Sequence, residues 1–251
     1  MLIECQKGIA VLAFPTWKDV LLCYWLTSKP PEGGFSTLHI SLVTGSEGKF
    51  IFADQIIIML GLKLPTDPRW VNLAEKSIED ILTDHAYCEQ KATSTNISLI
   101  QNYPEYEEMV DAVVPIVTEE WGHFKMVLDQ LKKRGLKLGP QRKDIYVNEL
   151  MSFVQKGGNR KQSLTDKLLF SAMIEARSCE RFKLLSKEVN DEELREFYKR
   201  LMVSEAGHYK LFLDLAISIS GEKHVEKRWL EWLDYEAEIM QKIELRGDRM
   251  H

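Results

Sequence analysis

Two Glu-x-x-His pairs are the residues of this chain whose types and spacing could support chemistry. They are Glu120-Trp-Gly-His123 and Glu205-Ala-Gly-His208. Both lie in stretches with helical periodicity, where positions i and i+3 share a face, so each pair directs a carboxylate and an imidazole to one place. Two such helices, each beside a helix that carries one more Glu, supply the ligands of a carboxylate-bridged di-iron or di-manganese site in a four-helix bundle.

Both pairs fall within apolar stripes. Glu120 is in helical register with Val113 and Val127, and Glu205 is in register with Leu201. The simpler interpretation is a solvated helix face with an incidental histidine. However, carboxylates almost never lie buried without a partner or a metal. Four such groups on two inward faces therefore favour a cation between them.

The first missing carboxylate can be located from helix geometry. A helix over 70–102 would carry Glu89, and the turn to the next helix lies near Pro104. Glu89 is fifteen residues before Pro104, and Glu120 is sixteen residues after it. Because a helix rises about 1.5 Å per residue, both carboxylates would lie at one height, about 22 Å from the turn.

The second missing carboxylate has two candidates. A helix over 165–189 ends before Asn190, with Glu175 fifteen residues before Asn190 and Glu205 fifteen residues after it. Glu180 is the rival, but it lies only ten residues from the turn, about 7 Å from the level of the other ligands. The helix rise favours Glu175.

The bulk composition is that of a globular intracellular protein. The chain has 251 residues and a net charge of −5, enough for one sizeable domain with a small appendage. Its four cysteines are scattered, without a Cys-x-x-Cys pair, so the sequence predicts no disulfide framework and no zinc or rubredoxin-type site. No apolar run is long enough to span a membrane, and the N-terminus has no signal-peptide pattern. We therefore expect a cytoplasmic protein without a membrane partner.

A basic run lies between the second and third long helices. It consists of Lys132, Lys133, Arg134, Lys137, Arg142 and Lys143. One interpretation is a helix end with its usual cations, followed by a solubilising loop. The other is a surface that contacts phosphates. The pattern by itself favours the first.

Residues 1–58 differ from the rest of the chain. They contain no Arg and include two strand-like runs, Ser36–Val43 and Lys49–Ile58. One interpretation is a small appended β element, and the other is an assigned start that lies upstream of the real one at Met59. The domain division expected is therefore 1–58 and 59–251.

The remainder is predicted to be all-α. Long helices are expected over 68–102, 105–134, 165–189 and 191–220, with a shorter helix near 144–155 and a last one over 222–245. Gly135 would end the second helix, Ser163-Leu-Thr-Asp166 reads as a capping box that opens the third, and Asp191 would cap the fourth. Two tight hairpins joined by a long, helix-containing crossover form the topology of a ferritin-like four-helix bundle, with the last helix packed outside it.

Six segments resemble the tRNA 2-methylthio-N6-isopentenyladenosine hydroxylase family, MiaE. They are Leu62–Trp70, Asp84–Ala92, Glu119–Phe124, Lys132–Leu136, Glu175–Phe182 and Ser204–Tyr209. The resemblance covers about 60–240, nearly all of the helical part. Its motifs are specific in combination and order.

The resemblance implies a ferritin-like, non-haem di-iron enzyme. Such an enzyme uses dioxygen and two electrons to hydroxylate the isopentenyl group of the modified adenosine next to the anticodon. The iron ligands implied are Glu89, Glu120, His123, Glu175, Glu205 and His208. The sequence has no flavin or nicotinamide fingerprint, so the electrons would come from a separate reductase.

A tRNA substrate changes the interpretation of the basic run. Enzymes that modify a base take it out of its stack, and phosphate contacts supply most of the affinity. The candidate tRNA-binding residues are Lys132, Lys133, Arg134, Arg142 and Lys143.

Two other functions would also fit a four-helix bundle with these residues. Another ferritin-like activity, a ferroxidase or peroxidase, is the alternative, and a scaffold that keeps the bundle without iron is disfavoured by the full ligand set.

Gly122 and Gly207 precede the two histidines where bulkier residues are common. Because glycine destabilises a helix by about 1 kcal/mol, we interpret both as relieving crowding near the metal.

Overall fold

The chain forms two compact units, residues 1–59 and 60–251. The computed structural model describes residues 2–5, 9–12, 22–25, 40–42 and 60–251. In the first unit, four strands form one antiparallel sheet in chain order: β1 (Leu2–Cys5), β2 (Ile9–Leu12), β3 (Leu22–Trp25) and β4 (Ile40–Leu42). β4 lies within the predicted run 36–43, whereas the predicted run 49–58 lies outside the described residues.

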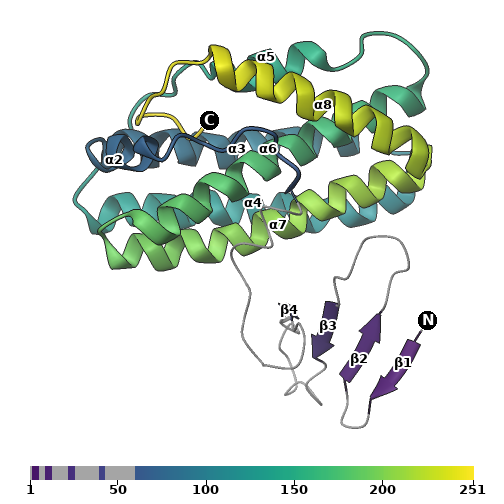
Figure 1. The fold of residues 1–251 in the computed structure, drawn as a ribbon, viewed down its shortest axis with the longest axis horizontal. Helices are drawn as coiled ribbons and strands as arrows, with labels where there is room; N and C mark the ends of the chain where they lie inside the picture. The colour runs from purple at the N-terminus through teal and green to yellow at the C-terminus, as the bar shows by residue number, and fades with distance from the viewer. Residues whose placement is uncertain (1, 6–8, 13–21, 26–39, 43–59) are drawn as a thin grey trace. The chain divides into compact units, whose positions relative to one another are not determined.

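Four long helices form the bundle in the second unit (Figure 1). They are α3 (Ile78–Asn102), α4 (Glu107–Lys133), α6 (Arg160–Glu188) and α7 (Glu192–Ser220). α3 packs along α4, α6 packs along α7, and α4 contacts α7. The predicted arrangement of two helical hairpins joined by a crossover is confirmed.

Two further helices lie along one side of the bundle (Figure 1). α5 (Ile145–Phe153) belongs to the crossover, and α8 (Glu222–Lys242) contacts α5, α6 and α7. Trp232 of α8 is fully buried, and Arg228 donates to both carboxylate oxygens of Asp166 on α6. These contacts attach the crossover and the last helix to the α6 side of the bundle. The last helix packs outside the four-helix bundle, as predicted.

Local signals explain where α4 ends and α7 begins. Gly135 has φ of 68°, a left-handed conformation that glycine adopts without steric cost, and Leu136 N–H donates back to the Leu131 carbonyl. The Asp191 side chain accepts the Leu194 N–H at 3.0 Å. Both predicted signals are confirmed, and they set the lengths of the two hairpins.

The predicted single helix over 68–102 is wrong. It is divided into α2 (Arg69–Glu75) and α3, because Ser77 leaves the helical conformation with φ −136° and ψ 45°. The break lets Trp70 turn into the core, where its Nε1 donates to the Arg249 carbonyl and the Arg181 guanidinium lies 4.6 Å from its ring centroid. Tertiary packing therefore overrides a continuous helical pattern.

The predicted capping box at 163–166 is also wrong. α6 begins earlier, at Arg160, and its capping box joins the Asn159 side chain to Gln162. Gly157 and Gly158, which precede the N-cap Asn159, both have positive φ and form the turn before α6. Asp166 is instead a buried acceptor inside the helix, paired with an arginine of α8.

The helices of the bundle are amphipathic. Val113, Leu201 and Phe212 are buried as their periodicity predicts. Within the described part of the chain, no helix combines the length and apolar character that crossing a membrane requires.

Candidate metal centre

The six predicted ligands meet inside the bundle. One ligand atom from each member lies within 4.8 Å of the others in two groups of four. The first group is Glu89, Glu120, His123 and Glu205, and the second is Glu120, Glu175, Glu205 and His208. Every side chain is buried, with exposures between 1% and 6%. Glu120 and Glu205 belong to both groups, so the cluster has two adjoining halves that share two carboxylates.

Glu175 and Glu180 have different surroundings. Glu175 joins the cluster, as the helix rise favoured. Glu180 accepts hydrogen bonds from Thr66 N–H at 2.8 Å, from Thr66 Oγ1 at 2.6 Å and from Arg177 at 3.0 Å. Its carboxylate is therefore fully engaged on the side of α6 that faces residues 64–66.

Both imidazoles turn the same nitrogen towards the carboxylates. His123 Nδ1 lies 3.5 Å from oxygens of Glu89 and Glu205. His208 Nδ1 lies 2.8 Å from Glu120 Oε1 and 3.2 Å from Glu205 Oε2. Nδ1 is therefore the ring atom that each histidine directs at the carboxylates of the cluster.

The cluster concentrates negative charge in a buried place. Burial and the neighbouring carboxylates raise the pKa of Glu89 and Glu175 well above the usual range. Burial lowers the pKa of His123, but the adjacent Glu120 and Glu89 carboxylates outweigh it and raise that pKa to about 11. The carboxylates thus draw positive charge to the site, which is the environment that a metal cation requires.

The donor set fits a pair of first-row metal ions. Four buried atoms of the cluster make no hydrogen bond: Glu120 Oε1, His123 Nδ1, Glu205 Oε1 and His208 Nε2. The close approach of His208 Nδ1 to Glu120 Oε1 lacks hydrogen-bond alignment, so that oxygen also has a free lone pair. Buried polar atoms without partners are costly. Carboxylate oxygens with one imidazole per half suit iron or manganese.

Comparison with known proteins matches this helical unit to one family. The family described as tRNA-(MS[2]IO[6]A)-hydroxylase (MiaE) matches residues 55–251. The chain belongs to the MiaE family. Its relatives and a solved structure extend this result.

Two relatives of the MiaE-family chain carry the same name, tRNA 2-(methylsulfanyl)-N(6)-isopentenyladenosine(37) hydroxylase. The protein from Pseudomonas putida is 37% identical over 66% of this chain and 80% of its own length. The protein from Salmonella typhimurium is 28% identical over 64% of this chain and 77% of its own length. A solved structure, protein 43 with aldehyde deformylating oxygenase activity from Synechococcus, has a TM-score of 0.72 and 32% identity over 76% of this chain and 94% of its own. The MiaE-family unit is therefore a ferritin-like bundle.

Two residues that the sequence analysis did not assign to the site support its ligands. His85 is fully buried and lies 2.6 Å from Glu89 Oε1 through its Nε2. Burial lowers the pKa of His85 to about 3, so this imidazole is neutral and its Nε2 shares a hydrogen bond with the Glu89 carboxyl group. The sequence indicated this pairing through its His-x-x-x-Glu spacing, which places the two side chains about one helical turn apart on the same face.

Glu119 is the second such residue. Its carboxylate lies 3.2 Å from His208 Nε2 and 3.9 Å from His123 Nε2, and it also accepts from Ser204 Oγ. The adjacent His208 imidazole lowers the pKa of Glu119 to about 2. One partly exposed carboxylate on α4 therefore faces the outer nitrogen of both imidazoles, which keeps Nδ1 directed inward.

Replacing Glu119 with Ala in this MiaE-family chain is expected to weaken metal binding by about 10- to 100-fold, because groups that orient a histidine ligand typically contribute that much. Anaerobic titration of the metal-free protein with Co(II), followed by absorption spectroscopy, measures the affinity. Asp111→Ala, an exposed acidic position on the same helix, is the matched control and should leave the isotherm unchanged. If both variants bound Co(II) with the same affinity, Glu119 would have no role in orienting the histidines.

The interpretation of Gly122 and Gly207 as relieving crowding is wrong. A Cβ placed on either glycine would meet no heavy atom within 4 Å. Both positions have open space beside them, and nothing in the structure explains why glycine precedes each histidine.

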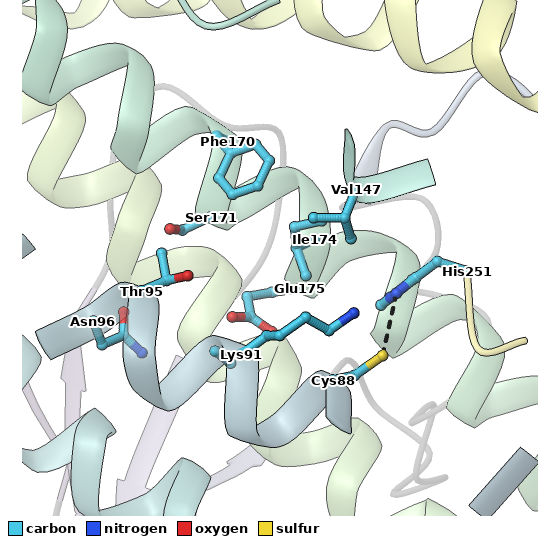
Figure 2. Close-up of a pocket in the computed structure, with 11 residues that line it drawn as sticks. Cys88, Lys91, Thr95, Asn96, Val147, Phe170, Ser171, Ile174, Glu175 and His251 are labelled. Atoms are coloured by element: carbon cyan, nitrogen blue, oxygen red, sulfur yellow. Dashed lines mark hydrogen bonds between the residues drawn. The ribbon is translucent and has the colours of Figure 1, made fainter. Parts of the chain in front are cut away.

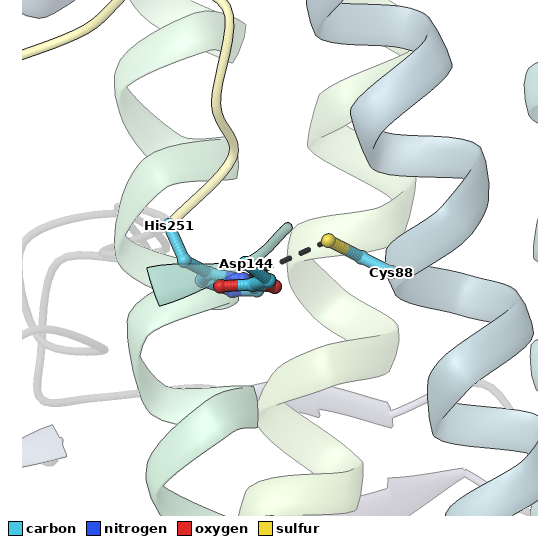
Figure 3. A group of neighbouring side chains, drawn as sticks. All are labelled: Cys88, Asp144 and His251. Atoms are coloured by element: carbon cyan, nitrogen blue, oxygen red, sulfur yellow. Dashed lines mark hydrogen bonds between the residues drawn. The ribbon is translucent and has the colours of Figure 1, made fainter. Parts of the chain in front are cut away.

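A third group of possible ligands lies apart from the six. Figure 3 shows Cys88, Asp144 and His251 side by side. Their ligand atoms lie within 4.8 Å of one another. The Lys91 ammonium lies 2.5 Å from Asp144 Oδ2 and already neutralises that carboxylate. His251 Nε2 bonds to Ser178 Oγ at 2.9 Å, and burial lowers the pKa of this imidazole to about 3. We therefore interpret the group as packing between α3, α5 and residue 251.

The basic residues predicted to bind tRNA fall into two sets in the MiaE-family chain. Lys132 and Lys133 at the end of α4 expose 74% and 57% of their side chains, and Lys143 in the crossover is also exposed. Arg134 is paired with Asp191, and Arg142 with Asp80 and Asp248. The two arginines attach the crossover to the bundle, whereas the three lysines extend from the surface.

Proposed function

We propose that this chain hydroxylates the isopentenyl group of 2-methylthio-N6-isopentenyladenosine next to the anticodon of tRNA. The observation that carries the proposal is the buried six-residue cluster, found in a family whose relatives are named for that reaction. A tRNA substrate is consistent with a cytoplasmic protein.

Two irons would be held by the cluster. Glu89 and His123 would bind one ion, Glu175 and His208 the other, and Glu120 and Glu205 both. When bound, an iron pair supplies the redox chemistry that activates dioxygen and oxidises an unactivated carbon. The surrounding helices keep the ligands in one geometry and exclude water from the reacting carbon.

The reaction needs electrons from outside the chain. Hydroxylation replaces a C–H bond by C–OH, and one dioxygen, two electrons and two protons yield the alcohol and one water. We propose that a separate reductase delivers the two electrons, since the sequence carries no flavin or nicotinamide fingerprint.

The anticodon arm would bind at the end of α4 and in the crossover. The predicted set was Lys132, Lys133, Arg134, Arg142 and Lys143, and the ion pairs of the structure refine it. Lys132 and Lys133 pair with Asp129 and Glu193, but these pairs are well exposed, as phosphate contacts require. Arg134 and Arg142 are only 16% and 25% exposed within their pairs. We assign the phosphate contacts to the lysines and a supporting role to the arginines.

Changing Lys132, Lys133 and Lys143 together to Ala is expected to weaken tRNA binding. Each lost phosphate contact should lower the slope of log K against log salt by about 1. Binding to fluorescently labelled tRNA at four salt concentrations measures the slope. The matched control changes Lys223, Lys227 and Lys242 of α8, which are equally exposed, and should keep it. If the salt dependence of tRNA binding were unchanged in the first variant, these lysines would only make the surface soluble.

Nucleoside analysis of tRNA tests the function itself. A strain that lacks the protein should accumulate the unhydroxylated nucleoside, and the purified, iron-loaded protein should convert it with dioxygen and a reductant. A ferroxidase or peroxidase would instead oxidise iron or consume peroxide without tRNA. An unchanged nucleoside profile in the deletion strain would overturn the proposal.

A further inference from the structure

A cavity on the α3 and α6 side of the bundle reaches the ligand cluster. It holds about 430 Å³ of space free of protein atoms, its open mouth included. Figure 2 shows its walls: Cys88, Lys91, Thr95 and Asn96 come from α3, Val147 from α5, and Phe170, Ser171, Ile174 and Glu175 from α6. Of the six ligands, Glu175 lines this cavity. The cavity is therefore a route from solvent to one half of the cluster.

The lining of the cavity favours an apolar ligand. Ala92, Val147, Phe170 and Ile174 provide hydrocarbon walls beside Glu175. Burying an anionic group there would place it against a buried carboxylate, which is unfavourable. The one charged side chain of the wall that could meet an anion, Lys91, is held by Asp144 at 2.5 Å. A short, uncharged hydrocarbon chain suits these walls.

One polar atom in the wall is without a partner. Ser171 is only 5% exposed, and its Oγ makes no hydrogen bond. A buried hydroxyl without a partner is costly, and such groups in native proteins usually have a functional explanation. This oxygen therefore indicates where a polar atom of a bound molecule would lie.

We propose that this cavity receives the isopentenyl group of the modified adenosine and that Ser171 Oγ accepts a hydrogen bond from its N6–H. This inference rests on the proposed function, which names the substrate but not where it enters. The prenyl chain would occupy the space between Val147, Phe170 and Ile174, with its end at Glu175.

Helix geometry matches the length of the substrate. Ser171 and Glu175 are four residues apart on α6, which corresponds to about 6 Å along the helix axis. The N6 atom is four bonds from a terminal methyl carbon of the isopentenyl group, a span of about 5 Å at bond lengths near 1.5 Å. When the methyl carbon lies beside Glu175, N6 lies beside Ser171.

The first test fills the cavity. Ile174→Trp should reduce the preference for prenylated over unprenylated tRNA by at least about tenfold, since an apolar pocket discriminates about 10- to 200-fold per methylene. The Kd ratio of the two tRNAs is measured with metal-free protein, so it does not depend on turnover. Ile97→Trp, the same change at an exposed position of α3 outside the cavity lining, is the control and should keep the wild-type ratio.

The second test removes the hydroxyl without filling space. Ser171→Ala should weaken the binding of prenylated tRNA by about 2- to 12-fold, the usual contribution of one hydrogen bond. Ser171→Thr keeps the hydroxyl and should restore most of that affinity. Circular dichroism checks that each variant is folded.

The outcomes separate this inference from the proposed function. If wild-type protein hydroxylates tRNA while Ile174→Trp keeps the wild-type Kd ratio and Ser171→Ala keeps the wild-type Kd for prenylated tRNA, the cavity assignment is overturned and the function stands. If wild-type protein neither hydroxylates nor prefers prenylated tRNA, the proposed function and the cavity assignment are both overturned. A loss confined to Ile174→Trp would keep the cavity and overturn the role of Ser171.

Discussion

His208→Ala is expected to lose most of its bound iron and to lower hydroxylation by more than about 100-fold, because even groups that merely orient metal ligands contribute 10- to 100-fold. His208 is the only imidazole in its half of the cluster. Its Nδ1 lies within 3.2 Å of oxygens of both shared carboxylates. Without it, that half offers carboxylates alone, which hold Fe(II) less well than a mixed set.

The fold of this variant should persist. α7 is anchored by buried Leu201 and Phe212 on either side of the site, and truncating one side chain leaves this packing in place. Iron per chain, measured by emission spectrometry after anaerobic loading, and helicity, measured by circular dichroism, together check the prediction. His224→Ala, an exposed histidine of α8, is the control. Two irons per chain in His208→Ala would show that the imidazole is not a ligand.

Arg177→Ala should destabilise the protein by about 3–5 kcal/mol, because it leaves two buried carboxylates without their cation. Arg177 is completely buried and donates to Glu236 at 2.6 Å, to Glu180 at 3.0 Å and to the Leu64 carbonyl at 3.0 Å. It therefore joins α6, α8 and the segment before α2. For a unit of this size, the loss corresponds to a fall in Tm of about 6–20 °C.

Lys199→Ala is the matched control for this change. Lys199 and Glu196 form a pair with the same i, i+3 spacing as Arg177 and Glu180, but both side chains are about 60% exposed. Exposed pairs contribute little, so the control should keep the wild-type Tm. Thermal unfolding followed by circular dichroism compares the variants. A Tm for Arg177→Ala within 2 °C of wild type would contradict the assigned role.

The positions of the clustered residues could be predicted because the helix rise is constant. Counting residues from each turn placed Glu89 level with Glu120 and Glu175 level with Glu205, and each pair shares a group in the structure. The same counting set Glu180 aside, but it could not show that Glu180 bonds to Thr66, more than a hundred residues away. That these side chains bind iron stays a prediction.

Helix boundaries were predicted less well where tertiary contacts set them. The break at Ser77 accompanies the packing of Trp70 against Arg181, a contact between residues that no local pattern links. Asp166 has the sequence pattern of a cap but lies inside α6, where Arg228 of α8 pairs with it. In both places a distant partner determined the outcome.

The sequence by itself indicated the members of the buried cluster, the bundle topology and the family, because helical periodicity, turn residues and motif order are local properties of the chain. Only the tertiary structure decided which side chains surround the ligands. The rotation of each helix about its axis, which sequence spacing leaves undefined, brings Glu119 to both imidazoles and Ser171 into a cavity beside Glu175. That rotation is set by how side chains from distant segments pack into one core.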